Sequence, residues 1–219
     1  MDCSEACEKG DLELFKSLYL KEDFSELGEY FSLACKGGNV EIAKLIFSCC
    51  PVSSSELRWG MIYACQQGHL NVVKFVLEKD SHKPRIGLWD ACQTGQSDVV
   101  KFLIEQKGFS SSLNNNEMSY ACIPFYRQNI CNNSIRMRKQ FQTIKVLINK
   151  ECSEWSLPFQ WNIPFVESLS YDELKQYHQK SLFPQEVLLL VKKRLYIIHF
   201  LGKNMFPVLN KSLREKLFS

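Results

Sequence analysis

A short pattern of fixed residues recurs four times, at nearly even spacing, in the first half of this chain. Each copy begins with Ala-Cys, has Gly four residues after the Ala, and has Lys ten residues after it. The copies lie at residues 6–16, 34–44, 64–74 and 91–101, so their starts are 28, 30 and 27 residues apart. Repeats of about 20 to 50 residues are typical of stacked supersecondary units. The pattern therefore predicts a repeat array.

Each copy has the pattern of two helices joined by a turn. Apolar residues at helical spacing surround the Ala, as in Phe31, Ala34 and Cys35, and Gly38 is suited to end that helix in the left-handed conformation. A second apolar stripe follows each turn, as in residues 72–77. A single hairpin cannot bury its apolar stripe, so the copies must stack side by side. The small Ala and Cys residues allow the first helices to approach closely.

At these positions the chain resembles the ankyrin-repeat family, whose helix-turn-helix units carry the same Ala, Gly and paired aliphatic residues. The match is closest in residues 63–80, YACQQGHLNVVKFVLEKD, and is good in residues 33–49 and 90–108. The family's Thr-Pro-Leu-His opening is missing, and the periods are shorter than the usual ~33 residues. The resemblance covers about residues 3–150. It implies an all-α solenoid with shortened hairpins that acts as a non-catalytic scaffold, adaptor or inhibitor.

A fifth copy begins at residues 120–122, but its Lys, Lys145, follows Ala121 by 24 residues instead of ten. The difference predicts an insertion at about residues 125–140, which we expect to be a loop because it is rich in asparagine. Residues 123–150 contain six Lys and Arg and no acid, although the net charge of the chain is only +3. We therefore predict a basic patch in this insertion, formed by Arg127, Arg136, Arg138 and Lys139.

The repeat period fades after residue 150, and we expect residues 151–219 to form a connector followed by capping helices. Ser170 and Glu173 have the spacing of a capping box, and Pro184 precedes a long apolar helix. Leucines at four-residue spacing predict a short amphipathic helix over residues 206–218. We expect these helices to cover the end of the array; the alternative is that they also bind a partner.

The surface of the first helices is the predicted binding site. The residue directly before each repeat Ala is expected to face outward, and it varies while Ala-Cys is constant. Constant packing residues beside variable exposed ones are typical of a recognition scaffold. We predict that a partner protein binds the concave face of the array through Leu33, Tyr63, Gln67, Asp90, Thr94 and Tyr120. Trp59 and Trp89 lie near the repeat junctions and are expected mainly to pack between repeats.

Two other classes of function have less support in the sequence. None of the four histidines belongs to a catalytic or metal-binding motif, and no pair of cysteines has metal-binding spacing, so we expect no enzyme activity, cofactor or metal. The alternative to concave-face binding is that the basic patch binds nucleic acid or an acidic protein surface. In the nucleic-acid case Phe125, Tyr126 and Phe141 would supply stacking surface, although no known nucleic-acid-binding motif is present.

The sequence also predicts where the protein resides. Its longest apolar runs are too short to span a membrane, and its acidic N-terminus does not resemble a secretory signal. We therefore expect a cytoplasmic protein, with a nuclear location also open, that is a monomer with reduced cysteines. Five of the ten cysteines directly follow an alanine and are expected to be buried thiols in the repeats: Cys7, Cys35, Cys65, Cys92 and Cys122.

Overall fold

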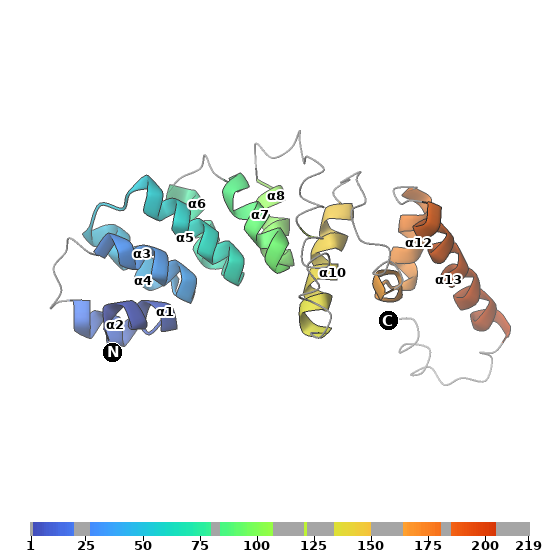
Figure 1. Ribbon diagram of the computed structural model, residues 1–219, viewed down its shortest axis with the longest axis horizontal. Helices are drawn as coiled ribbons and strands as arrows, with labels where there is room; N and C mark the ends of the chain where they lie inside the picture. The colour runs from blue at the N-terminus through green and yellow to red at the C-terminus, as the bar shows by residue number, and fades with distance from the viewer. Residues whose placement is uncertain are drawn as a thin grey trace.

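The computed structural model describes residues 2–19, 27–79, 84–106, 121, 134–149, 164–180 and 185–204, and these residues form helices and turns without any strand. Figure 1 shows the helices following one another along the longest axis of the molecule, from the N-terminus to α13. The predicted all-α class is thus confirmed over the described ranges.

Four helix pairs correspond to the four copies of the repeat. Their first helices are α1 (Cys3–Lys9), α3 (Leu27–Gly37), α5 (Ser54–Gln67) and α7 (Pro84–Thr94). Their second helices are α2 (Leu12–Tyr19), α4 (Val40–Cys49), α6 (Leu70–Lys79) and α8 (Ser97–Ile104). After them come α10 (Ser134–Asn149), a helical turn at 164–167, α12 (Tyr171–Lys180) and α13 (Gln185–Asn204).

The turn within each pair has the left-handed glycine that the sequence predicts. Gly68 has a φ of 83°, which a residue with a Cβ rarely adopts, and the N–H of the following residue, His69, donates to the Ala64 carbonyl at 2.9 Å. The other three turn glycines have the same conformation, with φ between 69° and 80°. The fixed spacing of Ala and Gly in the sequence is therefore the spacing of a helix end and its cap.

Polar side chains link each pair to the one before it. In the second, third and fourth pairs, the residue after the turn glycine forms a hydrogen bond with a backbone carbonyl near the end of the preceding first helix. These bonds join Asn39 to Gly10 (2.7 Å), His69 to Lys36 (3.0 Å) and Gln96 to Gln66 (2.9 Å). Asn39 also accepts hydrogen bonds from the backbone N–H groups of Glu41 and Ile42 in the first turn of α4, so it caps this helix and also binds the preceding pair. These bonds fix the register of neighbouring pairs.

The first helices meet through small residues. Each Ala-Cys of the first four copies is fully buried. Gly60 lies against the previous first helix, and a Cβ there would be 2.8 Å from the Phe31 ring and 2.9 Å from the Cys35 sulfur. Gly87 lies in the same way against Cys65. A larger residue at either position would have to displace its neighbour.

The second half of α10 aligns with the second helix of the predicted fifth copy. Gln140, five residues before Lys145, occupies the position that follows the turn glycine in the other copies, and its side-chain amide donates to the carbonyls of Cys92, at 2.6 Å, and Ala121. Thr143 and Ile144, at the position of the aliphatic pair, are fully buried. Residues 134–139 therefore extend this helix on its N-terminal side.

This extension corrects the predicted loop. Residues 134–139 are helical, whereas we expected the insertion to be irregular up to about residue 140. The reason lies in the segment SIRMRKQFQ, which contains no Gly or Pro and several residues with good helix propensity, so nothing stops the helix between Ser134 and Asn149. The asparagines that suggested a loop all precede Ser134. Residues 125–133 lie outside the described ranges, as does Cys122.

The C-terminal part contains the predicted helix start at Ser170. The Ser170 N–H donates to the Glu173 carboxylate at 2.7 Å, and the Glu173 N–H donates to the Ser170 hydroxyl at 3.3 Å, so the capping box is confirmed. The apolar helix predicted after Pro184 is α13. The amphipathic helix expected at 206–218 falls outside the described residues.

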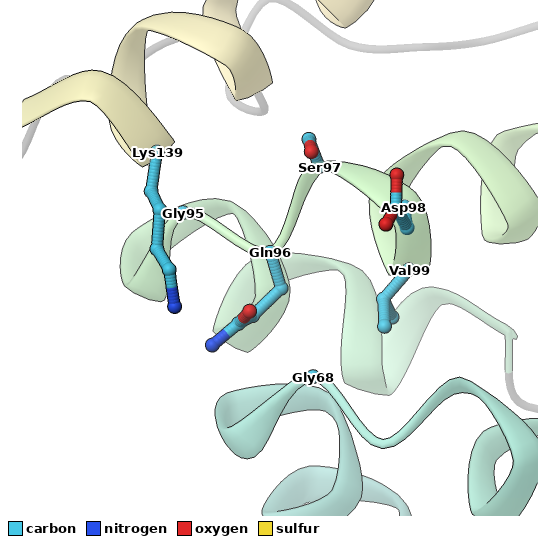
Figure 2. Close-up of a pocket in the computed structure, with 7 residues that line it drawn as sticks. All are labelled: Gly68, Gly95, Gln96, Ser97, Asp98, Val99 and Lys139. Atoms are coloured by element: carbon cyan, nitrogen blue, oxygen red, sulfur yellow. The ribbon is translucent and has the colours of Figure 1, made fainter. Parts of the chain in front are cut away.

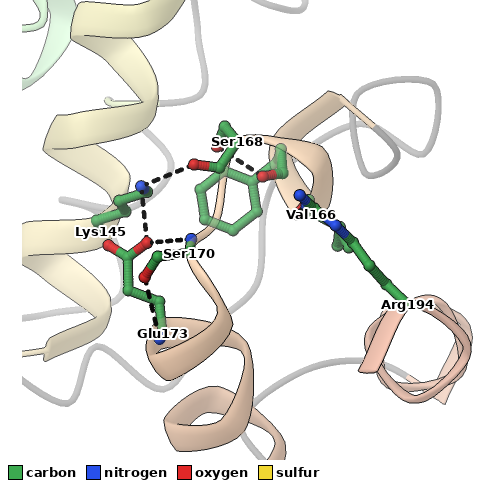
Figure 3. Close-up of polar contacts among 7 residues, drawn as sticks. Lys145, Val166, Ser168, Ser170, Glu173 and Arg194 are labelled. Carbon is green, nitrogen blue, oxygen red and sulfur yellow. Dashed lines mark hydrogen bonds and ion pairs between the residues drawn. The ribbon is translucent and has the colours of Figure 1, made fainter. Parts of the chain in front are cut away.

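A partly buried ion pair joins this C-terminal part to α10. The Lys145 side chain is 8% exposed, and its ammonium group lies 3.1 Å from both the Glu173 carboxylate and the Ser168 carbonyl (Figure 3). Arg194 of α13 donates to the Val166 carbonyl, which brings the last helix onto the turn at 164–167. Lys145, at the position of the repeat Lys, thus binds the segment that contains Ser168 and Glu173.

Candidate interaction surfaces

The positions directly before each repeat Ala do not share one environment. Leu33 and Tyr63 are half-buried. Asp90 is only 3% exposed, so its predicted place on the exposed surface is wrong. The Gln66 amide donates to the Asp90 carboxylate at 2.7 Å and draws it into the junction between α5 and α7. Burial raises the pKa of Asp90, and the hydrogen bond from Gln66 opposes that rise. Tyr120 lies outside the described residues.

The positions three residues after the Ala are closer to the surface. Gln67 is exposed at the end of α5. Thr94 is half-buried, and its hydroxyl donates to the Asp90 carbonyl at 2.8 Å. Gln67 is therefore the more accessible of these two predicted contact residues.

Three aromatic side chains lie on the exposed side of the adjacent helices α5 and α7. Trp59 is 50% exposed and stacks on Tyr63, with ring centroids 5.9 Å apart and planes inclined by 27°. Trp89 is 44% exposed. About half of each tryptophan side chain is therefore accessible, and packing of the other half between repeats stays a prediction. The four-residue spacing of Trp59 and Tyr63 on one helix was the sequence signal for this pair.

The first two of the first helices, α1 and α3, carry charged side chains on their surface. Lys36 of α3 forms an ion pair with Glu8 of α1 at 2.9 Å, and both side chains are nearly half exposed. The hydrogen bond and the negative charge of Glu8 raise the pKa of Lys36. The face of the first helices thus has paired charges over α1 and α3 and aromatic rings over α5 and α7.

The predicted basic patch lies partly on the extension of α10. Arg136, Arg138 and Lys139 are exposed there, and Arg127 lies outside the described residues. Phe141 does not belong to this surface, because it is 2% exposed and packs edge-on against Phe165 with centroids 5.3 Å apart. Its predicted role in stacking on nucleic-acid bases is therefore wrong. The aliphatic periodicity that begins at Phe141 faces the core.

A small pocket of about 230 Å³ adjoins this patch (Figure 2). The Lys139 side chain extends from α10 toward the Gly95 turn and forms one wall. The other lining residues are Gly68, Gly95, Gln96, Ser97, Asp98 and Val99. The pocket lies beside the turns of the array and not among the exposed aromatic rings.

The cysteines and the possible metal ligands of the described residues give no indication of a reactive thiol or a metal site. None of these cysteines forms a disulfide bond, and burial raises the pKa of Cys7 to about 12 and also raises those of Cys35 and Cys65. These thiols stay protonated and pack as small apolar groups. Within the same residues no three His, Cys, Asp or Glu side chains are grouped as metal ligands. None of the described helices has the length and apolarity needed to cross a membrane.

Comparison of the chain with the models of known protein families and with curated protein sequences gives no match.

Proposed function

We propose that this chain is a non-catalytic protein-binding module of the ankyrin-repeat type, and that a partner protein binds the face formed by its first helices. One observation carries the proposal: Trp59 and Trp89 are about half exposed on two adjacent first helices, and Trp59 stacks on the half-buried Tyr63. Large aromatic side chains at an accessible surface are typical binding anchors, because they bury a large area with few rotatable bonds.

The packing of the array supports a concave shape for this face. The first helices pack more closely against one another than the second helices do. A stack with this difference curves, and the first helices lie on its inner side. The small residues at the junctions, such as Gly87 against Cys65, allow the close approach. Because the junctions between first helices are formed by these small residues, the exposed residues of the first helices can vary without changing how the helices pack.

The proposal can be tested by changing the aromatic pair. Trp59→Ala/Tyr63→Ala should weaken binding of the partner by about 30-fold or more, as truncation of a central aromatic anchor typically does. Wild-type and variant proteins would be immobilised and used to recover partners from lysate with and without nuclease. The affinity of each recovered partner would then be measured with purified protein.

A matched control is available on α13. Leu189 is 67% exposed, so Leu189→Ala removes an equally accessible apolar side chain from a different surface. This control should retain the partner. Retention of every partner by the Trp59→Ala/Tyr63→Ala variant would contradict the proposal, as would a partner lost equally from both variants.

A further inference from the structure

The extension of α10 presents a short mixed surface that the other second helices lack. Ile135 is 68% exposed, and Arg138 and Lys139 are exposed one helical turn further on. Residues three and four apart lie on the same side of a helix, so these three side chains form one face. We refer to Ile135, Arg138 and Lys139 as the extension face. It precedes the point, at Gln140, from which α10 matches the rest of the array.

Within the described residues, no ion pair neutralises the positive charge of the extension face. On α2 and α4 the repeat lysine has a glutamate three residues earlier, with Lys16–Glu13 and Lys44–Glu41 distances of 3.0 and 2.8 Å. Residues 123–150 contain no acid. Within the described residues neither Arg138 nor Lys139 forms an ion pair, although Asp98 lines the same pocket as Lys139.

The chemistry of the face favours a protein partner over a nucleic acid. Clustered cations attract either, but proteins that bind single-stranded nucleic acid without sequence preference combine such cations with exposed aromatic rings on which bases stack. Phe141, the aromatic residue nearest to these cations among the described residues of α10, is buried. The exposed neighbour is instead an aliphatic side chain, Ile135. An aliphatic residue beside two cations is complementary to an apolar side chain flanked by carboxylates.

We propose that the extension face binds a short acidic segment of a partner protein, in which an apolar residue contacts Ile135 and carboxylates pair with Arg138 and Lys139. Arginine can pair with a carboxylate through two parallel hydrogen bonds, which orients the segment, while lysine supplies a second point of attachment. This surface is separate from the aromatic face, so its function does not depend on the proposal above. A chain with both surfaces holds a partner at two points or joins two partners.

The test uses a defined probe, a fluorescein-labelled peptide in which glutamates flank a central leucine, and fluorescence anisotropy with the full-length protein. Arg138→Glu/Lys139→Glu should weaken binding by about tenfold or more, because it places like charges opposite one another. The matched control is Lys192→Glu/Lys193→Glu, which makes the same change in net charge at two exposed residues of α13 and should leave binding within about twofold.

A second variant tests the apolar contact without changing charge. Ile135→Ser should weaken binding of the leucine-containing peptide by about threefold to tenfold, in line with the loss of one partly buried aliphatic contact, and should not affect a peptide with serine in place of leucine. Circular dichroism would show that each variant has the helix content of the wild-type protein.

Several results would overturn the proposal. One is the absence of peptide binding to the wild-type protein at low salt, and another is an equal loss in the two charge-reversal variants. A labelled single-stranded oligonucleotide that binds more tightly than the peptide, and depends on the same residues, would assign the face to nucleic acid. Self-association lost only in Arg138→Glu/Lys139→Glu, measured by light scattering, would assign it to a second copy of the chain.

Discussion

Two of the junctions within the described residues differ in chemistry. Between the first helices the contacts are made by small apolar residues, as where Gly87 lies against Cys65. Between α10 and the C-terminal part the contact includes the partly buried Lys145–Glu173 ion pair. The same small residues occur in successive first helices, so the same kind of contact can be repeated along the array. An ion pair between residues 28 apart in sequence specifies a single neighbour, which suits the place where the repetition ends.

The largest effect is expected from filling a small-residue junction. Gly87→Ala places a methyl group where the Cys65 sulfur lies, so it should lower the free energy of unfolding by about 2 to 3 kcal/mol, despite the better helix propensity of Ala. Urea denaturation followed by circular dichroism measures this change. Cys65→Ala/Gly87→Ala should recover much of the loss, because the sulfur is gone. Additive losses in the double variant would show that the two residues do not compete for space.

A somewhat smaller effect is expected at the ionic junction. Lys145→Ala leaves the Glu173 carboxylate without its cation, and it should cost about 2 kcal/mol, less than a fully buried pair because Glu173 is 30% exposed. Hydrogen exchange in α12 should accelerate while α3 and α5 remain protected. Lys44→Ala, which removes the equivalent repeat lysine from an exposed pair, is the control and should cost only about 0.3 kcal/mol. Equal protection of α12 in both variants would contradict this role.

The smallest effect is expected at Asp90, a polar residue buried between the first helices α5 and α7. Asp90→Asn keeps an oxygen that accepts the Gln66 hydrogen bond and removes a buried charge, so it should raise the free energy of unfolding at pH 7 by about 1 kcal/mol. Burial raises the pKa of Asp90, so the folded wild-type protein binds a proton more readily than the unfolded chain. The advantage of the variant should therefore shrink as the pH falls through that raised pKa.

Denaturation curves at pH 7 and at pH values approaching the ordinary pKa of aspartate would measure this change. The same benefit at every pH would mean that the Asp90 carboxylate is not the cause. A loss of stability at pH 7 would mean that the carboxylate makes bonds that an amide cannot replace.

The features that could be predicted from the sequence are those that depend on residues close together in the chain. The helix pairs, their turns and the buried Ala-Cys residues follow from local spacing, and so does the capping box at Ser170. Each depends on residues within a few positions of one another, where helix geometry fixes the distances. The ankyrin-type curvature and the separation into repeats and cap stay predictions.

Features that depend on a neighbouring pair could not be predicted in the same way. Asp90 and Tyr63 occupy the same position of the repeat, but only Asp90 has Gln66 beside it on the preceding helix to satisfy a buried carboxylate. Lys145 and Lys44 also share a position, and only the former meets a segment that packs across it. The repeat motif predicts the same environment for Asp90 as for Tyr63, and for Lys145 as for Lys44. It contains no information on which residues the neighbouring helix presents.

The buried cysteines have a practical consequence for measurements on this protein. Cys7, Cys35, Cys65 and Cys92 place one thiol in the first helix of each pair, and each is fully buried. A thiol reagent can modify such a cysteine only when its own pair opens, so single-cysteine variants turn modification rates into local opening free energies. The chain thus contains a series of reporters, about one every 30 residues, by which the cooperativity of the array can be followed from one end to the other.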